Sequence, residues 1–501
     1  MLKNVGSNWV YTLVTIAVAF VLTPFLVKTL GTEGYGTWML ITSMTGYLSL
    51  LALGVPMASV RYIAEHVAED DECEVNRAIG SSAGLYVFLG SIALLVGVGL
   101  LAVFATYDIP QSIEVDANVA FVIAVLFAAS GFIALLPEGI MHAYDEFVPR
   151  NMVRVGVLLL RFFLTLWLLS LRPSLALLAS ILLGCQTLDF LASRLLIKRA
   201  HRRVRISLRD FDWAEGKRIF TFSLFVLLIY AGTRLSFETD SLVIGAFLDV
   251  GSIAYYTVSN SFLVYLMQFI VSIGAVVLPM ATRLKTQGRS AELEAVFLKW
   301  SKVALSVTMA ATLFLVVLGP RFIAWWIDPS FENPSGPVLQ ILMLSSLLFL
   351  PMRGVALPVL IGLGKPGIPT IGFLVTGLVN VGISIALVGQ LGLNGVALGT
   401  AIPNVLFAIV VIAQACQELG VGLMRYTVYV FPRVMLGALP VLGVLLWFRD
   451  VLDVRSLAGL FLGGSAMCVA FALVWIFFVY RGDPYFDARS QLARLTAWSR
   501  R

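Results

Sequence analysis

Charged side chains inside long apolar segments are the residues of this sequence with the clearest chemistry. Arg161 lies within "LLLRFFLTLW", Arg353 within "LPMRGVALP" and Arg234 within "AGTRLSFETD". A guanidinium can hold a phosphate or carboxylate group through two parallel hydrogen bonds. These arginines therefore predict a cationic cavity for an anionic group. Glu238 follows Arg234 by four positions, so an internal ion pair is an open alternative for Arg234.

The remaining charged candidates have more than one interpretation. Lys28 and Arg61 could bind the same anion, but both lie near predicted helix ends, where a long side chain can reach the membrane surface. Glu138, Asp240 and Glu238 are candidates for ion coupling, because an acidic group in an apolar segment is costly and is often functional.

The sequence has no pattern typical of catalysis or metal binding. His66, His142 and His201 are far apart, and the four cysteines lack the spacing of a metal site. No HExxH motif is present, and the one GxSxG match, GSSAG at 80–84, lies within the apolar segment 78–106, which is predicted to be a helix rather than a strand-to-helix turn. We therefore expect a protein that is not an enzyme and that uses no metal or other cofactor.

The composition predicts an all-α polytopic membrane protein. Hydrophobic residues form 59% of the 501 residues and charged residues 13%, about half the charged share of a soluble domain. Apolar runs of about twenty residues recur, and each is long enough to cross a bilayer as a helix. The net charge of +6 does not predict nucleic-acid binding, because Lys and Arg gather in the cytoplasmic loops of membrane proteins.

About fourteen membrane-spanning helices are expected. Their approximate ranges are 8–30, 37–60, 78–106, 118–143, 152–171, 174–197, 217–246, 253–279, 300–319, 337–363, 367–391, 394–415, 427–448 and 456–480. The loop 198–218 contains eight Lys or Arg residues, which predicts that it and both termini are cytoplasmic. No predicted loop is long enough for a soluble nucleotide-binding domain, so an ATP-driven pump is not expected.

Two similar stretches suggest an internal repeat. The glycine-rich "KTLGTEGYGTW" (28–38) could cradle a phosphate, but "FLDVGSIAYYT" (247–257) repeats its pattern without its glycines. We therefore interpret both as turns between helices. The repeat predicts two pseudo-symmetric six-helix lobes followed by a helix pair. The expected parts are an N-terminal lobe (1–199), a basic linker (200–216), a C-terminal lobe (217–415), helices 13 and 14 (416–480) and a cytoplasmic tail (481–501).

Several of these stretches resemble one known family. "PFLVKTLGTEGYGTW", "LALGVPMASVRYIAEH" and "LIGLGKPGIPTIGFLVTGLVNVGISIALVGQLGLNGVALGTAI" are similar, in order and spacing, to segments of Wzx-type polysaccharide flippases. These belong to the multidrug/oligosaccharidyl-lipid/polysaccharide exporter (MOP) superfamily. The related lipid II flippases tend to have an Arg-Asp pair in the first helix, whereas this chain has the uncharged "FVLTPFLV" there. The polysaccharide branch is therefore favoured.

The resemblance implies a flippase of the bacterial inner membrane. Its substrate would be an undecaprenyl-pyrophosphate-linked oligosaccharide, moved to the periplasmic leaflet by alternating access during synthesis of O-antigen, lipopolysaccharide or exopolysaccharide. The implied partners are this lipid-linked oligosaccharide, membrane lipids and polysaccharide polymerase or chain-length machinery, and not nucleic acid. A multidrug or organic-cation antiporter of the same superfamily is the first alternative, and a membrane glycosyl polymerase or ligase is the second.

Overall fold

The computed structural model describes residues 2–52, 54–221 and 238–486. All regular elements in these ranges are helices, and twelve are long and apolar enough to span a membrane. This confirms the all-α polytopic class. One of the twelve, Val10–Ala68, covers the predicted spans 8–30 and 37–60. The predicted span 217–246 lies largely outside the described residues.

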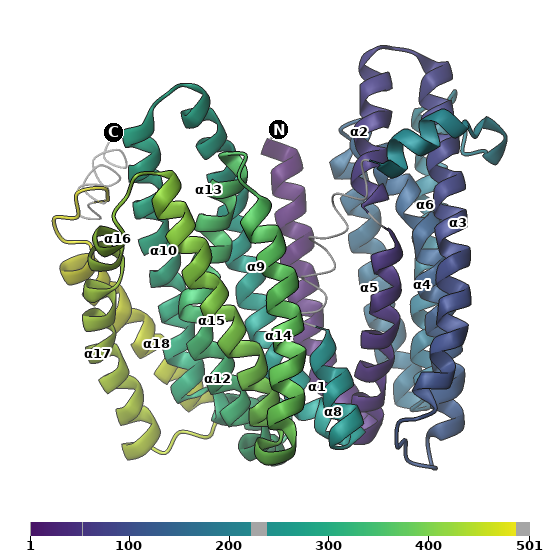
Figure 1. Cartoon of the computed structure of the whole chain (residues 1–501). Helices are drawn as coiled ribbons and strands as arrows, with labels where there is room; N and C mark the ends of the chain where they lie inside the picture. The colour runs from purple at the N-terminus through teal and green to yellow at the C-terminus, as the bar shows by residue number, and fades with distance from the viewer. Residues whose placement is uncertain (1, 53, 222–237, 487–501) are drawn as a thin grey trace, which may run out of the picture. The chain divides into compact units, whose positions relative to one another are not determined.

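The first helix, α1 (Leu2–Leu48), has a sharp break at Gly31. Its 47 residues would extend about 70 Å at 1.5 Å per residue, more than twice the thickness of a bilayer core. Gly31 has φ of 73°, a conformation that glycine adopts without the steric cost of a Cβ atom. The helix reverses direction there (Figure 1). The glycine-rich stretch is therefore a turn between two helical arms, as the sequence predicts.

The stretches 28–38 and 247–257 pack against each other, and their backbones come close at Gly36 and Val250. A Cβ atom on Gly36 would lie 1.7 Å from the carbonyl oxygen of Val250, so only glycine fits there. Each stretch lies where two helices join: the first around Gly31 of α1, the second between α8 (Thr239–Phe247) and α9 (Val250–Thr286). These glycines therefore serve chain reversal and close packing.

The chain divides into two compact units, Met1–Ala254 and Tyr255–Arg501. Besides α1 and α8, the first unit contains α2 (Val55–Ala68), α3 (Glu72–Phe104), α4 (Glu114–Ala143), α5 (Phe147–Leu171), α6 (Leu175–Ala200) and the short η2 (Leu208–Asp210). The five parts expected from the sequence, with their boundaries at 199, 216, 415 and 480, stay a prediction.

Helices α4 and α6 of the first unit run parallel and are joined by hydrogen bonds at two levels. Near their starts, the Asp116 carboxylate of α4 accepts hydrogen bonds from the Ser174 hydroxyl and from the backbone N–H of Leu175 and Ala176. Further along, the Gln186 amide of α6 donates to the Phe127 carbonyl oxygen of α4. The sequence separation is 58–60 residues at all these points, as a parallel arrangement requires.

The second unit is a separate helical bundle. It contains most of α9, followed by α10 (Ser290–Val317), α11 (Gly319–Trp326), α12 (Glu332–Pro351), the π-helical η4 (Met352–Ala356), α13 (Leu357–Gly362), α14 (Gly367–Leu391), α15 (Leu393–Glu418), α16 (Leu423–Val430), α17 (Pro432–Leu446) and α18 (Leu457–Val474). The predicted span 337–363 corresponds to α12, η4 and α13 together. Asn380 of α14 donates a hydrogen bond to the Thr400 hydroxyl of α15, so this buried amide links two helices.

Candidate functional site

Three arginines on one helix line a cavity in the first unit. Arg150, Arg154 and Arg161 of α5 are four and seven residues apart, so they recur on the same face of the helix. They border a cavity of about 320 Å³ together with Tyr11 of α1 and Asp189 of α6. This cavity, which we call the arginine cavity, brings the charged groups of α5 and α6 together.

Arg150 is the most enclosed of the three arginines. Its side chain is 4% exposed and binds Asp189 through two parallel hydrogen bonds of 2.7 and 2.9 Å. It also donates to Glu138 of α4 at 3.3 Å and to the Ser193 hydroxyl at 3.1 Å. Two carboxylates therefore neutralise this guanidinium, and the network ties α4, α5 and α6 together.

Arg154 is more loosely held, and Glu138 is its carboxylate partner. Its guanidinium lies 3.4 Å from Glu138 and 4.7 Å from the centre of the Tyr11 ring. The Arg154 side chain is 30% exposed and lines the cavity, so it can face a ligand there, whereas Glu138, which is 22% exposed, is not among the lining residues. Glu138 thus lies between two arginines, which the sequence did not predict.

Arg161 provides the uncompensated charge of the site. Among the described residues, no hydrogen bond or ion pair engages its guanidinium, and Cys185 and Tyr11 are its neighbours on the cavity wall. The cluster contains three arginines (150, 154 and 161) and two carboxylates (138 and 189), for a net charge of +1. The cavity is therefore suited to an anion, because its third cation has no internal partner.

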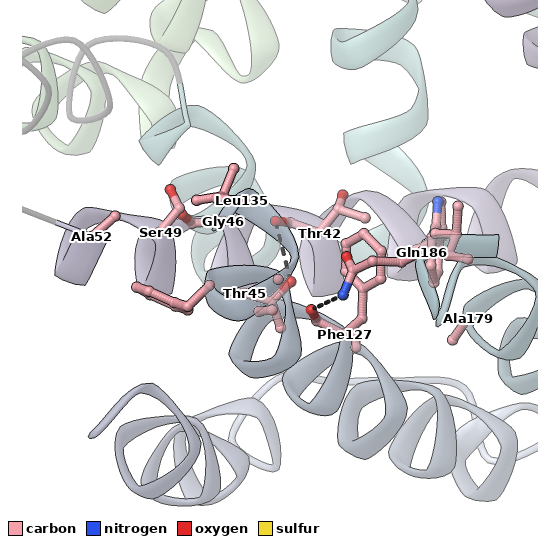
Figure 2. Close-up of a pocket in the computed structure, with 15 residues that line it drawn as sticks. Thr42, Thr45, Gly46, Ser49, Ala52, Phe127, Leu135, Ala179 and Gln186 are labelled. Carbon is pink, nitrogen blue, oxygen red and sulfur yellow. Dashed lines mark hydrogen bonds between the residues drawn. The ribbon is translucent and has the colours of Figure 1, made fainter. Parts of the chain in front are cut away.

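A second cavity of about 370 Å³ adjoins the first (Figure 2). Residues of α1, α4 and α6 line it, and most of them are apolar or small, among them Trp38, Ala124, Ala128, Gly131 and Ala179. We call it the apolar cavity. Its wall includes Phe127, Leu182 and Gln186, and these three residues also line the arginine cavity. The two cavities therefore share a wall.

Arg353, in the second unit, has an unusual setting. It lies in η4, a π-helical turn, and π-helical turns are often found at functional sites. Its guanidinium stacks 4.8 Å from the centre of the Phe373 ring and 5.9 Å from that of Phe349. Its Nε atom is buried without a hydrogen-bond partner in the described part of the chain. The sequence also predicts a cavity shared by Arg161, Arg353 and Arg234; that remains a prediction.

Four other residues predicted from the sequence are not among those that line the arginine cavity. Lys28 is exposed on α1, and Arg61 is exposed on α2 beside the Tyr62 ring. Asp240 is buried near the start of α8, and Glu238 is the residue before that helix. Arg234 lies outside the described residues, so its pairing with Glu238 stays a prediction.

Sequence reasoning missed Arg150, Arg154 and Asp189. The predicted span began at residue 152 and left Arg150 in a loop, whereas α5 begins at Phe147. The signal was the spacing of seven and eleven residues before Arg161, which places the three arginines on one helical face. Asp189 gave no such signal, because its partner lies 39 residues away in sequence.

The described residues contain no group of three or more His, Cys, Asp or Glu side chains arranged to hold a metal ion. The charged chemistry of the site is therefore that of guanidinium and carboxylate groups. Such a set can bind and release an anion.

The fold is that of a multi-pass membrane protein built from helices. It is similar to an inward-facing multidrug resistance MATE family transporter, with a TM-score of 0.69 and 17% identity over 82% of this chain and 98% of the transporter. It is also similar to the lipid II flippase MurJ in an inward closed conformation, with a TM-score of 0.68 and 14% identity over 93% of this chain and 98% of MurJ.

The sequence comparison identifies the family within this class. The chain belongs to the polysaccharide biosynthesis protein family, whose sequence pattern matches residues 1–285. It is 22% identical over 414 residues to the membrane protein EpsK of Bacillus subtilis, covering 80% of each chain. The resemblance found in the sequence motifs is therefore confirmed.

Proposed function

We propose that this protein is a flippase that moves an undecaprenyl-pyrophosphate-linked oligosaccharide from the cytoplasmic to the periplasmic leaflet of a bacterial inner membrane. The family and the superfamily fold support a transporter of this type. The basic loop 198–218 supports cytoplasmic termini. The polysaccharide made downstream would be an O-antigen or an exopolysaccharide, and a polymerase would act next on the flipped product.

The observation that carries this proposal is Arg161, which has no partner among the described residues and lies on a candidate membrane-spanning helix where that helix lines the arginine cavity. Arginine is costly in a membrane unless a ligand or a partner satisfies it. A pyrophosphate offers several oxygens that can accept paired hydrogen bonds from a guanidinium. Arg154 lies on the same wall and supplies a second donor, and Arg353 is a candidate for a further contact.

The membrane potential can supply the driving force for this transport. A pyrophosphate with about two negative charges gains roughly 4–5 kcal/mol on moving outward across 100 mV, inside negative, at about 2.3 kcal/mol per charge. Coupled ions would change this balance. Glu138, Asp240 and Glu238 are the candidate coupling residues, and Glu138 is the one whose carboxylate bonds directly to the arginines of the cavity.

A multidrug antiporter is the second candidate, because one similar structure is a MATE transporter. The charge of the arginine cavity opposes that function: three arginines and two carboxylates leave a net positive site, which repels an organic cation. A glycosyl polymerase or ligase has no specific support from the site.

The test is transport by an Arg161→Ala variant reconstituted in liposomes with a fluorescent lipid-linked oligosaccharide. Loss of a charge-assisted contact worth about 1.5–3 kcal/mol should slow flipping by roughly 10- to 150-fold. Arg161→Lys should recover only part of the rate, because lysine keeps the charge but not the paired geometry. Arg172→Ala, an exposed arginine after the end of the same helix, is the matched control and should transport normally. Normal transport by Arg161→Ala would remove this site from the mechanism.

A further inference from the structure

We propose that the apolar cavity binds the first isoprene units of the polyprenyl chain while the arginine cavity binds the pyrophosphate. This inference rests on the proposed function and assigns a second part of the same substrate to a second cavity. It identifies a hydrocarbon site inside the first unit, directly beside the anion site.

The shared wall makes the two sites adjacent, as the substrate requires. In a polyprenyl pyrophosphate the hydrocarbon begins one bond from the phosphate oxygen, so the two binding sites must be contiguous. Phe127, Leu182 and Gln186 line both cavities, and Arg161 lines the arginine cavity with them. The volume of about 370 Å³ lies within the usual range of small-molecule sites, about 300–1,000 Å³.

The hydroxyl groups in the apolar cavity are not free to donate to a ligand. The Thr42 hydroxyl donates to the Met39 carbonyl oxygen, Thr45 to Ile41 and Ser49 to Gly46, each within its own helical segment. A hydroxyl has one proton, and these protons are already used. The wall therefore presents an apolar surface with few donors, which suits a hydrocarbon better than a sugar.

The amide of Gln186 is engaged in the same way. Its Nε2 atom donates to the Phe127 carbonyl oxygen and to the Ser130 hydroxyl, and Figure 2 shows the amide directed toward Phe127. This holds the amide against α4, where it marks the border between the two cavities. The chain of the substrate would pass this border on its way from the charged to the apolar side.

Small residues create the space. Ala124, Ala128 and Gly131 lie on one face of α4, and Ala179 faces them from α6. A Cβ atom on Gly131 would meet Gln186 at 3.6 Å, which is ordinary contact, so a modest side chain fits here but a long one would enter the cavity. Bulky substitutions at these positions should therefore fill the hydrocarbon site without touching the arginines.

The experiment measures binding of two probes to the purified full-length protein: farnesyl pyrophosphate, which has three isoprene units, and inorganic pyrophosphate. Farnesyl pyrophosphate should bind wild-type protein at least about tenfold more tightly, since each buried methylene adds to affinity. Ala128→Phe should remove most of this advantage and leave inorganic pyrophosphate affinity within about twofold. Gly131→Leu is the second filling variant, for use if Ala128→Phe does not fold.

Val122→Phe is the matched control, because Val122 lies on the same helix but is exposed on another face. It should bind both probes like the wild type. Equal affinity of wild-type protein for the two probes, or an undiminished farnesyl advantage in the filled variants, would overturn the inference. So would a filled variant that loses affinity for a lipid-free glycosyl pyrophosphate instead, because the cavity would then hold sugar.

Failure of the proposed function has a different signature. If inorganic pyrophosphate does not bind wild-type protein, or if Arg161→Ala leaves its affinity unchanged, the anion site itself is wrong. If Arg161→Ala weakens pyrophosphate binding but farnesyl pyrophosphate binds no more tightly than inorganic pyrophosphate, the anion site is supported and only the hydrocarbon site is wrong.

Discussion

Two clusters of buried charge, one in each unit, differ in how completely their groups are satisfied. In the second unit, Lys302 of α10 binds Asp483 at 2.6 Å, and the two side chains are 1% and 0% exposed. In the first unit, Arg150 is 4% exposed, but its partners Glu138 and Asp189 are 22% and 17% exposed, and Asp189 lines a cavity. Both clusters tie helices together, but only the cluster in the first unit borders a cavity where it can contact a ligand.

The Lys302 cluster is closed by further bonds. Lys302 also donates to the Val479 carbonyl oxygen and lies over the rings of Tyr429 and Tyr480. Asp483 accepts bonds from the Tyr429 hydroxyl and from the backbone N–H of Tyr485. With its donors and acceptors used internally, the pair fixes the end of the chain after α18 onto α10. We infer that a saturated pair serves stability, whereas an unsaturated group such as Arg161 serves binding.

The largest effect on stability is expected for Lys302→Ala. Removing one partner of a closed pair leaves the Asp483 carboxylate buried without its cation, which costs about 3–5 kcal/mol. Thermal unfolding of the purified protein should show this loss. Lys299→Ala, three residues earlier on α10, loses only ring contacts and should cost less than about 1 kcal/mol. The double variant Lys302→Met with Asp483→Leu should recover most of the stability; if it does not, the pair is more than a structural link.

The next largest effect is expected for Arg353→Ala, which should slow transport rather than destabilise the fold. Its guanidinium contacts aromatic rings and has an unpartnered Nε, so it resembles Arg161 more than Lys302. If it contacts the pyrophosphate, flipping should slow by about tenfold or more, since charge-assisted hydrogen bonds contribute about 1.5–3 kcal/mol. Unfolding temperature should stay unchanged or rise. If the variant transports normally but unfolds at a lower temperature, Arg353 serves stability, as Lys302 does.

A smaller effect is expected for Glu138→Gln. Arg150 keeps Asp189 as a partner, so the loss of stability should be about 1 kcal/mol, well below that of Lys302→Ala. The net charge of the arginine cavity rises from +1 to +2, which should strengthen inorganic pyrophosphate binding several-fold at low salt. Binding titrations at two salt concentrations provide the measurement. If Glu138 couples proton movement to transport, this variant should also lose the response of flipping to a pH gradient.

The smallest effect is expected from mild acid acting on Asp483. Burial raises the pKa of this carboxyl group, but the hydrogen bonds from Lys302 and Tyr429 outweigh burial and leave the pKa below its usual value. A carboxyl group with a depressed native pKa stabilises the fold above its unfolded pKa of about 3.9, and that contribution disappears as the pH falls through the native value. Unfolding temperatures at pH 7 and pH 5 should therefore show no loss from this group. An Asp483→Asn variant, which cannot titrate there, should lack the further loss below about pH 4.

Local patterns in the sequence predicted the features that depend on neighbouring residues. The apolar runs predicted the helices, and the reversal at Gly31 followed from a glycine-rich stretch between two such runs. The importance of Arg161 was predicted from its charge alone. Lys302 gives the contrast: it is buried within α10, and no local pattern identifies it as one half of an ion pair.

Tertiary structure alone decided which charges are satisfied. Asp189 lies 39 residues from Arg150, and Asp483 lies 181 residues from Lys302, so neither pair is visible in a local pattern. The contact between the arginine cavity and the apolar cavity likewise depends on how α1, α4, α5 and α6 pack. A sequence by itself determines where a charge enters an apolar helix, because hydrophobicity and helical period are local properties. Whether that charge is neutralised or left to bind a ligand depends on the facing helices, which only the packed structure brings into contact.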